Sequence, residues 1–150
     1  MNVDIDTLSS LLGCKANQHN FDKLWNIISL YDKYSIANNK FTPPTVLAKL
    51  SRDEYSYIRR AIASNPSTPI DIIAALSTDR DVWVRNYVAS NISTPVDIIG
   101  KLSNDEYECV REGVARNVST PAYILTELST DRDIIVLECA VEALRRINKL

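Results

Sequence analysis

The sequence predicts an all-α protein built as a solenoid of two-helix units, and three observations lead to this fold class. First, a Thr-Pro pair recurs every 26 residues without insertion or deletion, at Thr42-Pro43, Thr68-Pro69, Thr94-Pro95 and Thr120-Pro121. Second, apolar residues between these pairs follow the spacing of a helix face, twice in each unit. Third, only three glycines occur in 150 residues, which leaves little flexible linker. A fixed period of this kind is typical of chains whose units bury their apolar faces against one another.

The first helix of each unit follows the Thr-Pro pair. In the unit 68–93, we expect Thr68 to cap the helix and Pro69 to take the first helical position, where a missing N–H costs nothing. Ile72, Ile73 and Leu76 then form one apolar stripe. The equivalent stripes are Val46, Leu47 and Leu50; Ile98, Ile99 and Leu102; and Ile124, Leu125 and Leu128.

The second helix follows a polar turn. We expect Asp79 to cap it, because a carboxylate there can accept from free N–H groups and suits the positive end of the helix dipole. Val84, Val88 and Ala89 point inward, and Asn91 is expected to end the helix in a left-handed conformation, which Asn tolerates. The inward residues of the neighbouring units are Ile58, Ile62 and Ala63, and Val110, Val114 and Ala115. Isolated helices shorter than about 12–15 residues are marginal in water, so these units must stack.

We expect one domain over residues 1–150, with modified units at both ends. A solenoid needs such ends to shield its open core. The expected parts are an N-terminal cap helix in 1–16, a degenerate unit in 17–41, full units in 42–67, 68–93 and 94–119, and a last unit with an extended capping helix in 120–150.

Composition and charge narrow the classes of function. The net charge is −2 and the pI is near 5.4, whereas a protein that grips phosphates should be basic, so we expect no nucleic-acid partner. Cys14, Cys109 and Cys139 are widely spaced and fit reduced thiols rather than a disulfide or zinc framework. Neither a signal peptide nor a long apolar segment is visible, so we expect a cytoplasmic protein without membrane attachment.

The pattern shared by the units is T-P-x-x-Φ-Φ-x-x-L-S-x-D-x-x-x-x-Φ-R-x-x-Φ-A-x-N, where Φ is Ile, Val or Leu. It resembles the leucine-rich repeat variant family of bacterial α-solenoids, which are related to HEAT repeats. The resemblance covers about residues 42–144, and 17–41 more weakly. It implies short stacked helix pairs, in which one helix is α or 3₁₀, wound into a right-handed superhelix. A member of that family carries an iron–sulfur cluster, but the N-terminal segment here offers only Cys14 where a cluster takes four thiolates, so we expect no cofactor.

Aspartate and arginine recur in the same register of each unit. One interpretation is a basic row for phosphate or carboxylate ligands, and the other is a structural ladder in which each Arg bonds a neighbouring Asp or a helix-end carbonyl. Because the acid recurs together with the base, we favour the structural ladder. Its predicted members are Asp53, Arg59, Asp79, Arg85, Asp105 and Arg111.

Aromatic residues gather near the start of the second helices. Two interpretations stay open: a packed column between units, or an exposed apolar strip of the kind that marks a partner site. Tyr, Trp and Arg are the residues enriched in binding hot spots. If this face binds a partner, we expect Tyr57, Trp83 and Tyr87 to make the contact, with Arg60 and Asn86 as polar neighbours.

No catalytic constellation is visible in the sequence. His19 has no nucleophile or carboxylate at a telling spacing, and Cys109 and Cys139 lie among apolar residues, as small buried side chains do. We therefore expect neither catalytic nor metal-binding residues. The function predicted is a non-enzymatic scaffold or adaptor for another protein, as a monomer or weak homo-oligomer. The alternative is a HEAT-like enzyme or enzyme accessory, either chromophore-lyase-like or nucleic-acid-binding.

Overall fold

The computed structural model describes residue 25 and residues 27–147, and the expectation of an all-α chain is confirmed there. These residues form nine helices, α3 to α11, and no strand. The cap helix predicted for 1–16, and most of the degenerate unit before Leu30, lie outside the described residues.

Short and long helices alternate along the chain. The short helices have seven residues each: α4 (Pro44–Leu50), α6 (Ile70–Leu76), α8 (Val96–Leu102) and α10 (Ala122–Leu128). The long helices have nine residues, α3 (Leu30–Asn38), α5 (Ser56–Ser64), α7 (Val82–Ser90) and α9 (Glu108–Arg116), except that α11 (Ile134–Ile147) has 14. Both kinds are α-helices, so within the described residues neither helix of a pair is 3₁₀.

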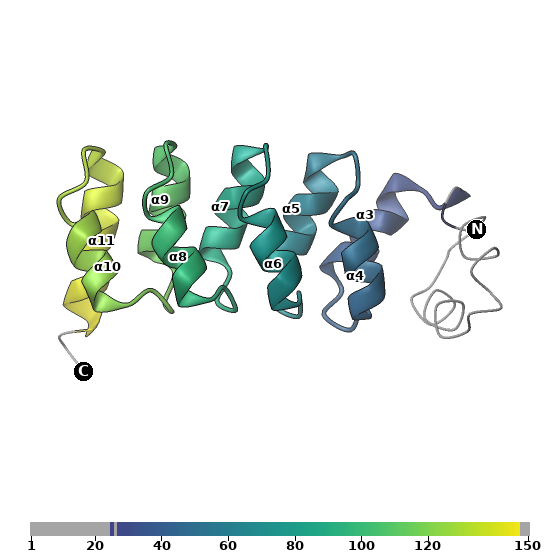
Figure 1. The fold of residues 1–150 in the computed structure, drawn as a ribbon, viewed down its shortest axis with the longest axis horizontal. Coiled ribbons are helices and arrows are strands. Elements are labelled where there is room, and N and C mark those ends of the chain that lie inside the picture. Colours follow the sequence, from purple (N-terminus) through teal and green to yellow (C-terminus); the bar gives the residue numbers. More distant parts are fainter. Residues whose placement is uncertain (1–24, 26, 148–150) are drawn as a thin grey trace.

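The helices lie side by side in two layers. Figure 1 shows the short helices in one layer, over the long helices in the other, with the two ends of the chain at opposite ends of the row. Each long helix packs against the next, so that α7 contacts both α5 and α9, and each short helix packs against its neighbouring long helices. The molecule is therefore elongated, with one exposed face for each layer.

The apolar stripes form the core between the two layers. All the residues predicted for the stripes of the short helices are buried, including Ile73 and Leu76 of α6. The inward residues predicted for the long helices are also buried, as Val84, Val88 and Ala89 of α7 illustrate. The expected spacing of inward residues is therefore confirmed for the described units.

The prediction that Thr68 caps a helix is wrong. The N-cap of α6 is Pro69, and the helix begins at Ile70. The Thr68 side chain is buried, and its hydroxyl donates to the carbonyl of Ile62 at 2.7 Å. The same contact is made by Thr42, Thr94 and Thr120 to the carbonyls of Ile36, Val88 and Val114. Each threonine thus satisfies a carbonyl at the end of the preceding long helix, where the helix itself supplies no donor.

The prediction that Asn91 adopts a left-handed conformation is also wrong. Asn91 has φ −75° and ψ 124°, and no described residue other than glycine has a positive φ. Its buried amide donates to the carbonyls of Ala63 at 2.7 Å and Asn65 at 3.2 Å, in the preceding helix pair. Asn65 and Asn117 make the equivalent bonds. These asparagines therefore connect successive helix pairs rather than only ending a helix.

The predicted cap of the long helix is displaced by two residues. Asp81, not Asp79, is the N-cap of α7, and its carboxylate accepts from the N–H groups of Trp83 and Val84. Asp79 accepts instead from the N–H of Asp81 at 2.9 Å, one step outside the helix. Asp79 is thus left with its other carboxylate oxygen for a partner elsewhere.

Candidate functional site

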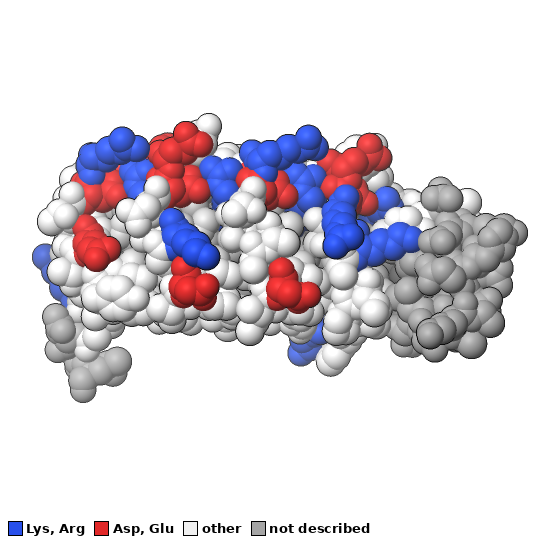
Figure 2. All heavy atoms as spheres, in the orientation of Figure 1, with Lys and Arg blue, Asp and Glu red and all other residues white. Residues whose placement is uncertain are grey.

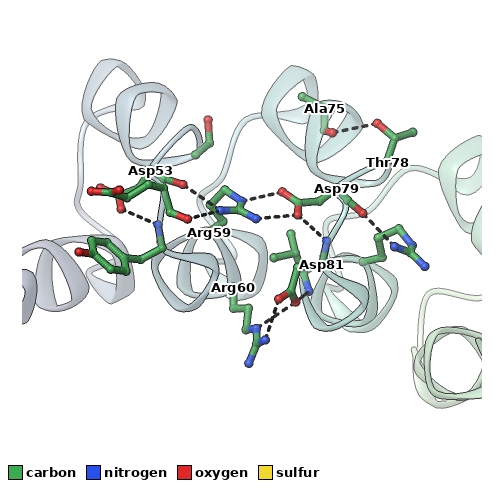
Figure 3. A network of polar contacts seen from close by, with 12 residues as sticks. Asp53, Arg59, Arg60, Ala75, Thr78, Asp79 and Asp81 are labelled. Carbon is green, nitrogen blue, oxygen red and sulfur yellow. Dashed lines mark hydrogen bonds and ion pairs between the residues drawn. The ribbon is translucent and has the colours of Figure 1, made fainter.

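The polar residues that the sequence singled out form a row of ion pairs along one edge of the molecule. Arg59, on α5, donates to both carboxylate oxygens of Asp79, at 2.7 and 2.8 Å, and Arg60 lies beside it (Figure 3). The same guanidinium donates to the carbonyls of Asp53 and Glu54 at 2.9 and 3.1 Å. Each carboxylate partner therefore comes from the following helix pair, and the aspartate of the same pair contributes its carbonyl.

The pattern repeats along the chain with closely similar distances. Arg85 binds Asp105 at 2.7 and 3.0 Å, and Arg111 binds Asp131 at 2.8 and 2.9 Å. Lys33, 26 residues before Arg59, donates to Asp53 at 2.9 Å. We call this row the Arg–Asp ladder; its members are Lys33, Asp53, Arg59, Asp79, Arg85, Asp105, Arg111 and Asp131.

The environment of the ladder favours the charged form of each partner. Burial by itself raises the pKa of Asp79 and of Asp105, but hydrogen bonds from the guanidinium and from a backbone N–H outweigh it, so both pKa values are lowered. For Asp131, the hydrogen bond from Arg111 is the largest influence, and it also lowers the pKa. Every arginine of the ladder already has a carboxylate partner. The ladder therefore offers little free charge to a phosphate or carboxylate ligand.

The aromatic residues lie on the exposed face of the long helices. Tyr57 on α5 is 37% exposed, and Trp83 and Tyr87 on α7 are 48% and 42% exposed. They lie one turn apart or in equivalent positions of neighbouring helices, so they share one face. Of the two interpretations left open by the sequence, the half-exposed rings match the strip on the surface better than a packed column.

Tyr34, on α3, extends this face toward the N-terminal end. It is 46% exposed, and its ring centroid lies 6.2 Å from that of Tyr57, with the planes tilted by 47°. Tyr55 contacts Tyr57 from the turn before α5, at 5.7 Å. We call the surface formed by Tyr34, Tyr57, Trp83 and Tyr87 the aromatic face.

A groove runs across the aromatic face between three helices. It has a volume of about 390 Å³ and is lined by Tyr34 and Asn38 of α3, by Tyr57, Arg60, Ala61 and Ser64 of α5, and by Tyr87 of α7. Alanine and serine at its floor leave room between the larger tyrosines. The groove is therefore bordered by phenol rings and carries one guanidinium.

Arg60 and Asn86, the predicted polar neighbours, both bond to the next long helix. Arg60 donates to the two carboxylate oxygens of Asp81 at 3.2 and 2.9 Å, and this hydrogen bonding lowers the pKa of Asp81 from 3.8 to about 2. Asn86 donates to the carbonyl of Cys109 at 2.6 Å. Both side chains thus fix the spacing of the helices that carry the aromatic rings.

The remaining candidates do not join this site. Cys109 and Cys139 are half-buried free thiols packed against the core, and burial raises the pKa of each. A thiol with a raised pKa is a poor nucleophile at neutral pH. Cys14 and His19 lie outside the described residues.

Three participants escaped the sequence analysis, although the 26-residue register could have revealed them. Lys33 stands where Arg59 and Arg85 stand in later units, and Tyr34 stands in the register of Arg60. Asp131 had been identified as an equivalent of Asp79 without being included in the ladder. Subtracting or adding one period from each predicted site would have found all three, but no pattern indicated that the rings of Tyr34 and Tyr57 would meet.

Comparisons with protein-family models, with curated proteins and with solved structures find no match to this chain. In the part of the chain that the structure describes, no helix has the length and apolar character required to cross a membrane. The same part contains no cluster of three or more His, Cys, Asp or Glu side chains that could hold a metal ion. The candidate site therefore rests on the ladder and the aromatic face alone.

Proposed function

We propose that this chain is a right-handed α-solenoid of the leucine-rich repeat variant type, and that it is a non-enzymatic adaptor that binds a protein through its aromatic face. The observation that carries this proposal is the concentration of half-exposed Tyr and Trp rings around one groove. Such rings supply large contact areas with few rotatable bonds, and they are enriched at the centres of protein interfaces.

Rigidity supports the same proposal. The aromatic residues are placed on three helices that are linked by the ladder, by the asparagine bonds and by the Arg60–Asp81 pair. A surface that is ordered before binding loses little conformational entropy when a partner arrives. Modest contacts with a few rings can therefore yield useful affinity.

Charge supports a protein partner over a nucleic acid. The ladder arginines are paired with aspartates, Arg60 is paired with Asp81, and the whole chain carries a net charge of −2. Binding to a nucleic acid needs several basic side chains that are free to replace counterions along the phosphate backbone. The aromatic face offers a largely neutral surface instead.

The test compares two variants that remove exposed aromatic or aliphatic area from opposite layers. Trp83→Ala/Tyr87→Ala removes two rings from the aromatic face, whereas Tyr123→Ala/Ile70→Ala removes two exposed side chains from the short helices. Tagged wild type and both variants would be used to capture proteins from a lysate of the source organism, followed by quantitative mass spectrometry. We expect a partner that is recovered with wild type and the Tyr123/Ile70 variant and is lost with the Trp83/Tyr87 variant.

Two results would contradict the proposal. Equal recovery with both variants would place the binding site on another surface. A well-folded wild type that captures no protein would contradict an adaptor function and favour a small ligand or an enzymatic role. Circular dichroism of each variant would establish that the bait is folded.

A further inference from the structure

A second row of charged residues follows the edge of the molecule outside the Arg–Asp ladder. Its members occupy the turn before each long helix at intervals of 26 residues, and all are exposed: Glu54, Arg80, Glu106 and Arg132. We call them the rim charges. Figure 2 shows acidic and basic side chains alternating along this edge of the molecule. The sign of the rim charge therefore changes at every step from one helix pair to the next.

The rim charges have no ionic partner within the part of the chain that the structure describes. The only polar side-chain contact among them runs from Arg132 to the backbone carbonyl of Glu106, at 3.2 Å. The ladder aspartates beside them are already occupied by arginines or by Lys33. Fold stability thus accounts for the ladder and leaves the rim charges unused.

The order of the rim charges makes the edge complementary to itself. Read along the chain, the signs are minus, plus, minus, plus; read backward, they are plus, minus, plus, minus. Two copies that meet edge to edge in opposite directions therefore place every glutamate against an arginine. Such a pairing is the self-complementary contact that a twofold axis requires, in which residue i meets j and j meets i.

We infer that the rim binds a second copy of this chain in antiparallel orientation, with Glu54 opposite Arg132 and Arg80 opposite Glu106. The twofold axis passes between Arg80 and Glu106. Neighbouring residues do not oppose this pairing, because the preceding exposed positions place Arg52 opposite Thr130 and Thr78 opposite Asn104. Exposed Tyr55 and Tyr107, which follow two of the rim charges, add apolar area at the same edge.

This contact differs from the proposed partner site in position and in strength. It uses the edge of the two layers, whereas the aromatic face covers the outside of the long helices. Exposed ion pairs contribute little individually and are screened by salt. The dimer is therefore expected to form at high protein concentration and low ionic strength, and to dissociate as salt is added.

Charge reversal tests the pairing. Arg80→Glu/Arg132→Glu makes the rim wholly acidic, and Glu54→Arg/Glu106→Arg makes it wholly basic. In sedimentation velocity at low salt, we expect each variant to self-associate at least about tenfold more weakly than wild type, and an equimolar mixture to form a heterodimer. The control Asp97→Arg/Glu127→Arg changes the net charge as much as the basic-rim variant, but away from the rim, and should dimerise like wild type.

The direction of pairing has its own test. A mixture of Glu54→Cys and Arg132→Cys chains should form an intermolecular disulfide, above the background of the unsubstituted chain, and neither variant alone should do so. Preferred crosslinking of Glu54→Cys to Arg80→Cys would indicate a staggered head-to-tail contact and overturn the antiparallel dimer. The inference would also be overturned by a monomeric wild type at low salt, or by acidic and basic variants that do not combine. These variants retain Tyr57, Trp83 and Tyr87, so failure here leaves the adaptor proposal standing.

Discussion

Asn91 shows how one side chain connects two helix pairs. Its NH₂ group donates to the carbonyls of Ala63 and Asn65, and its oxygen accepts from the N–H of Ser93 at 2.9 Å. Only an amide of this length can donate to two carbonyls and accept from one N–H at the same place. The carbonyls it satisfies belong to the end of α5 and the turn after it, where the helix supplies no further donors.

We predict that Asn91→Ala lowers the free energy of unfolding by about 1–3 kcal/mol, because it leaves buried polar groups of the preceding unit without a donor. Asn104→Ala is the matched control, since Asn104 is exposed and bonds only within its own unit. It should change the free energy of unfolding by less than about 0.5 kcal/mol. Urea denaturation followed by circular dichroism measures both. Equal effects of the two substitutions would show that the Asn91 bonds contribute nothing special.

The two helical glycines differ in the space around them. A Cβ on Gly100 would meet only Ile124 at 3.9 Å, an ordinary contact, whereas a Cβ on Gly113 would meet the Ser90 hydroxyl at 3.0 Å and the Asn86 amide at 3.1 Å. We predict that Gly100→Ala raises the free energy of unfolding by about 0.5–1 kcal/mol, through the higher helix propensity of alanine. Gly113→Ala should not, because the Asn86 amide must move from its bond to Cys109. Thermal unfolding of both variants decides the matter, and an equal gain for both would contradict the crowding at Gly113.

At this scale the sequence predicted which residues matter better than what they do. The recurrence of Thr68 and Asn91 in every unit indicated a common role, and general capping preferences supplied the wrong one. Caps are local interactions, whereas Asn91 bonds to residues 26 and 28 positions earlier. Sequence spacing alone does not indicate that distant carbonyls lie within reach.

The Arg85–Asp105 pair shows how elements are joined along the edge. It links α7 to the turn before α9, and Arg85 also lies 5.5 Å from the centroid of the Tyr107 ring. The side chains of Arg85 and Asp105 are 12% and 10% exposed, so the pair is neither fully buried nor freely solvated. Its geometry is bidentate, which favours arginine over lysine at this position.

We predict that Arg85→Leu lowers the free energy of unfolding by roughly 1–4 kcal/mol, between the values typical of exposed and of buried pairs. Much of this loss should come from the carboxylate of Asp105, which would keep its charge without a guanidinium. Arg85→Leu/Asp105→Leu should therefore be less destabilised than the sum of the single variants, in a double-mutant cycle measured by urea denaturation. Partner capture should persist in Arg85→Leu. Lost capture with unchanged stability would instead make Arg85 a ligand-binding residue.

The helices themselves were largely predictable, whereas their exact ends were not. Helix pairs, their burial pattern and their order follow from apolar spacing between the Thr-Pro pairs. The start of α7 was misplaced because Asp79 and Asp81 are both good cap residues, and only the geometry of the turn selects Asp81. Pairing of Arg59 with the Asp79 carboxylate rather than with that of Asp53 likewise depends on how far one unit is displaced from the next.

Across the whole molecule, ion pairs connect every long helix to the following turn. The ladder runs from Lys33 on α3 to Asp131 before α11, and the Arg60–Asp81 pair lies beside it. The row ends where Leu137 replaces the arginine of earlier units. Proton binding by several of these carboxylates would therefore weaken contacts along most of the described length at once.

This arrangement leads us to predict that the protein loses stability in acid. The pKa of Asp81 is about 2 in the fold, against an ordinary value of 3.8, and the pKa values of Asp79, Asp105 and Asp131 are also lowered. A carboxyl whose pKa is lowered by folding stabilises the fold above its ordinary pKa, and this contribution disappears as the pH falls through the folded value. The urea midpoint should thus be steady near neutral pH and decrease between about pH 4 and pH 2.

Asp81→Asn isolates the largest of these shifts that carries a value, because it retains an oxygen that can cap α7 but cannot titrate. We expect the stability difference between wild type and this variant to be greatest near neutral pH and to shrink as the pH approaches 2, since only the wild-type residue gains a proton. Carboxyl carbon chemical shifts of Asp81, recorded by NMR across the same range, should give its pKa directly. A midpoint for Asp81 near 4 would contradict the Arg60 pairing in solution, whereas a low value would tie the acid sensitivity of the molecule to contacts between neighbouring units.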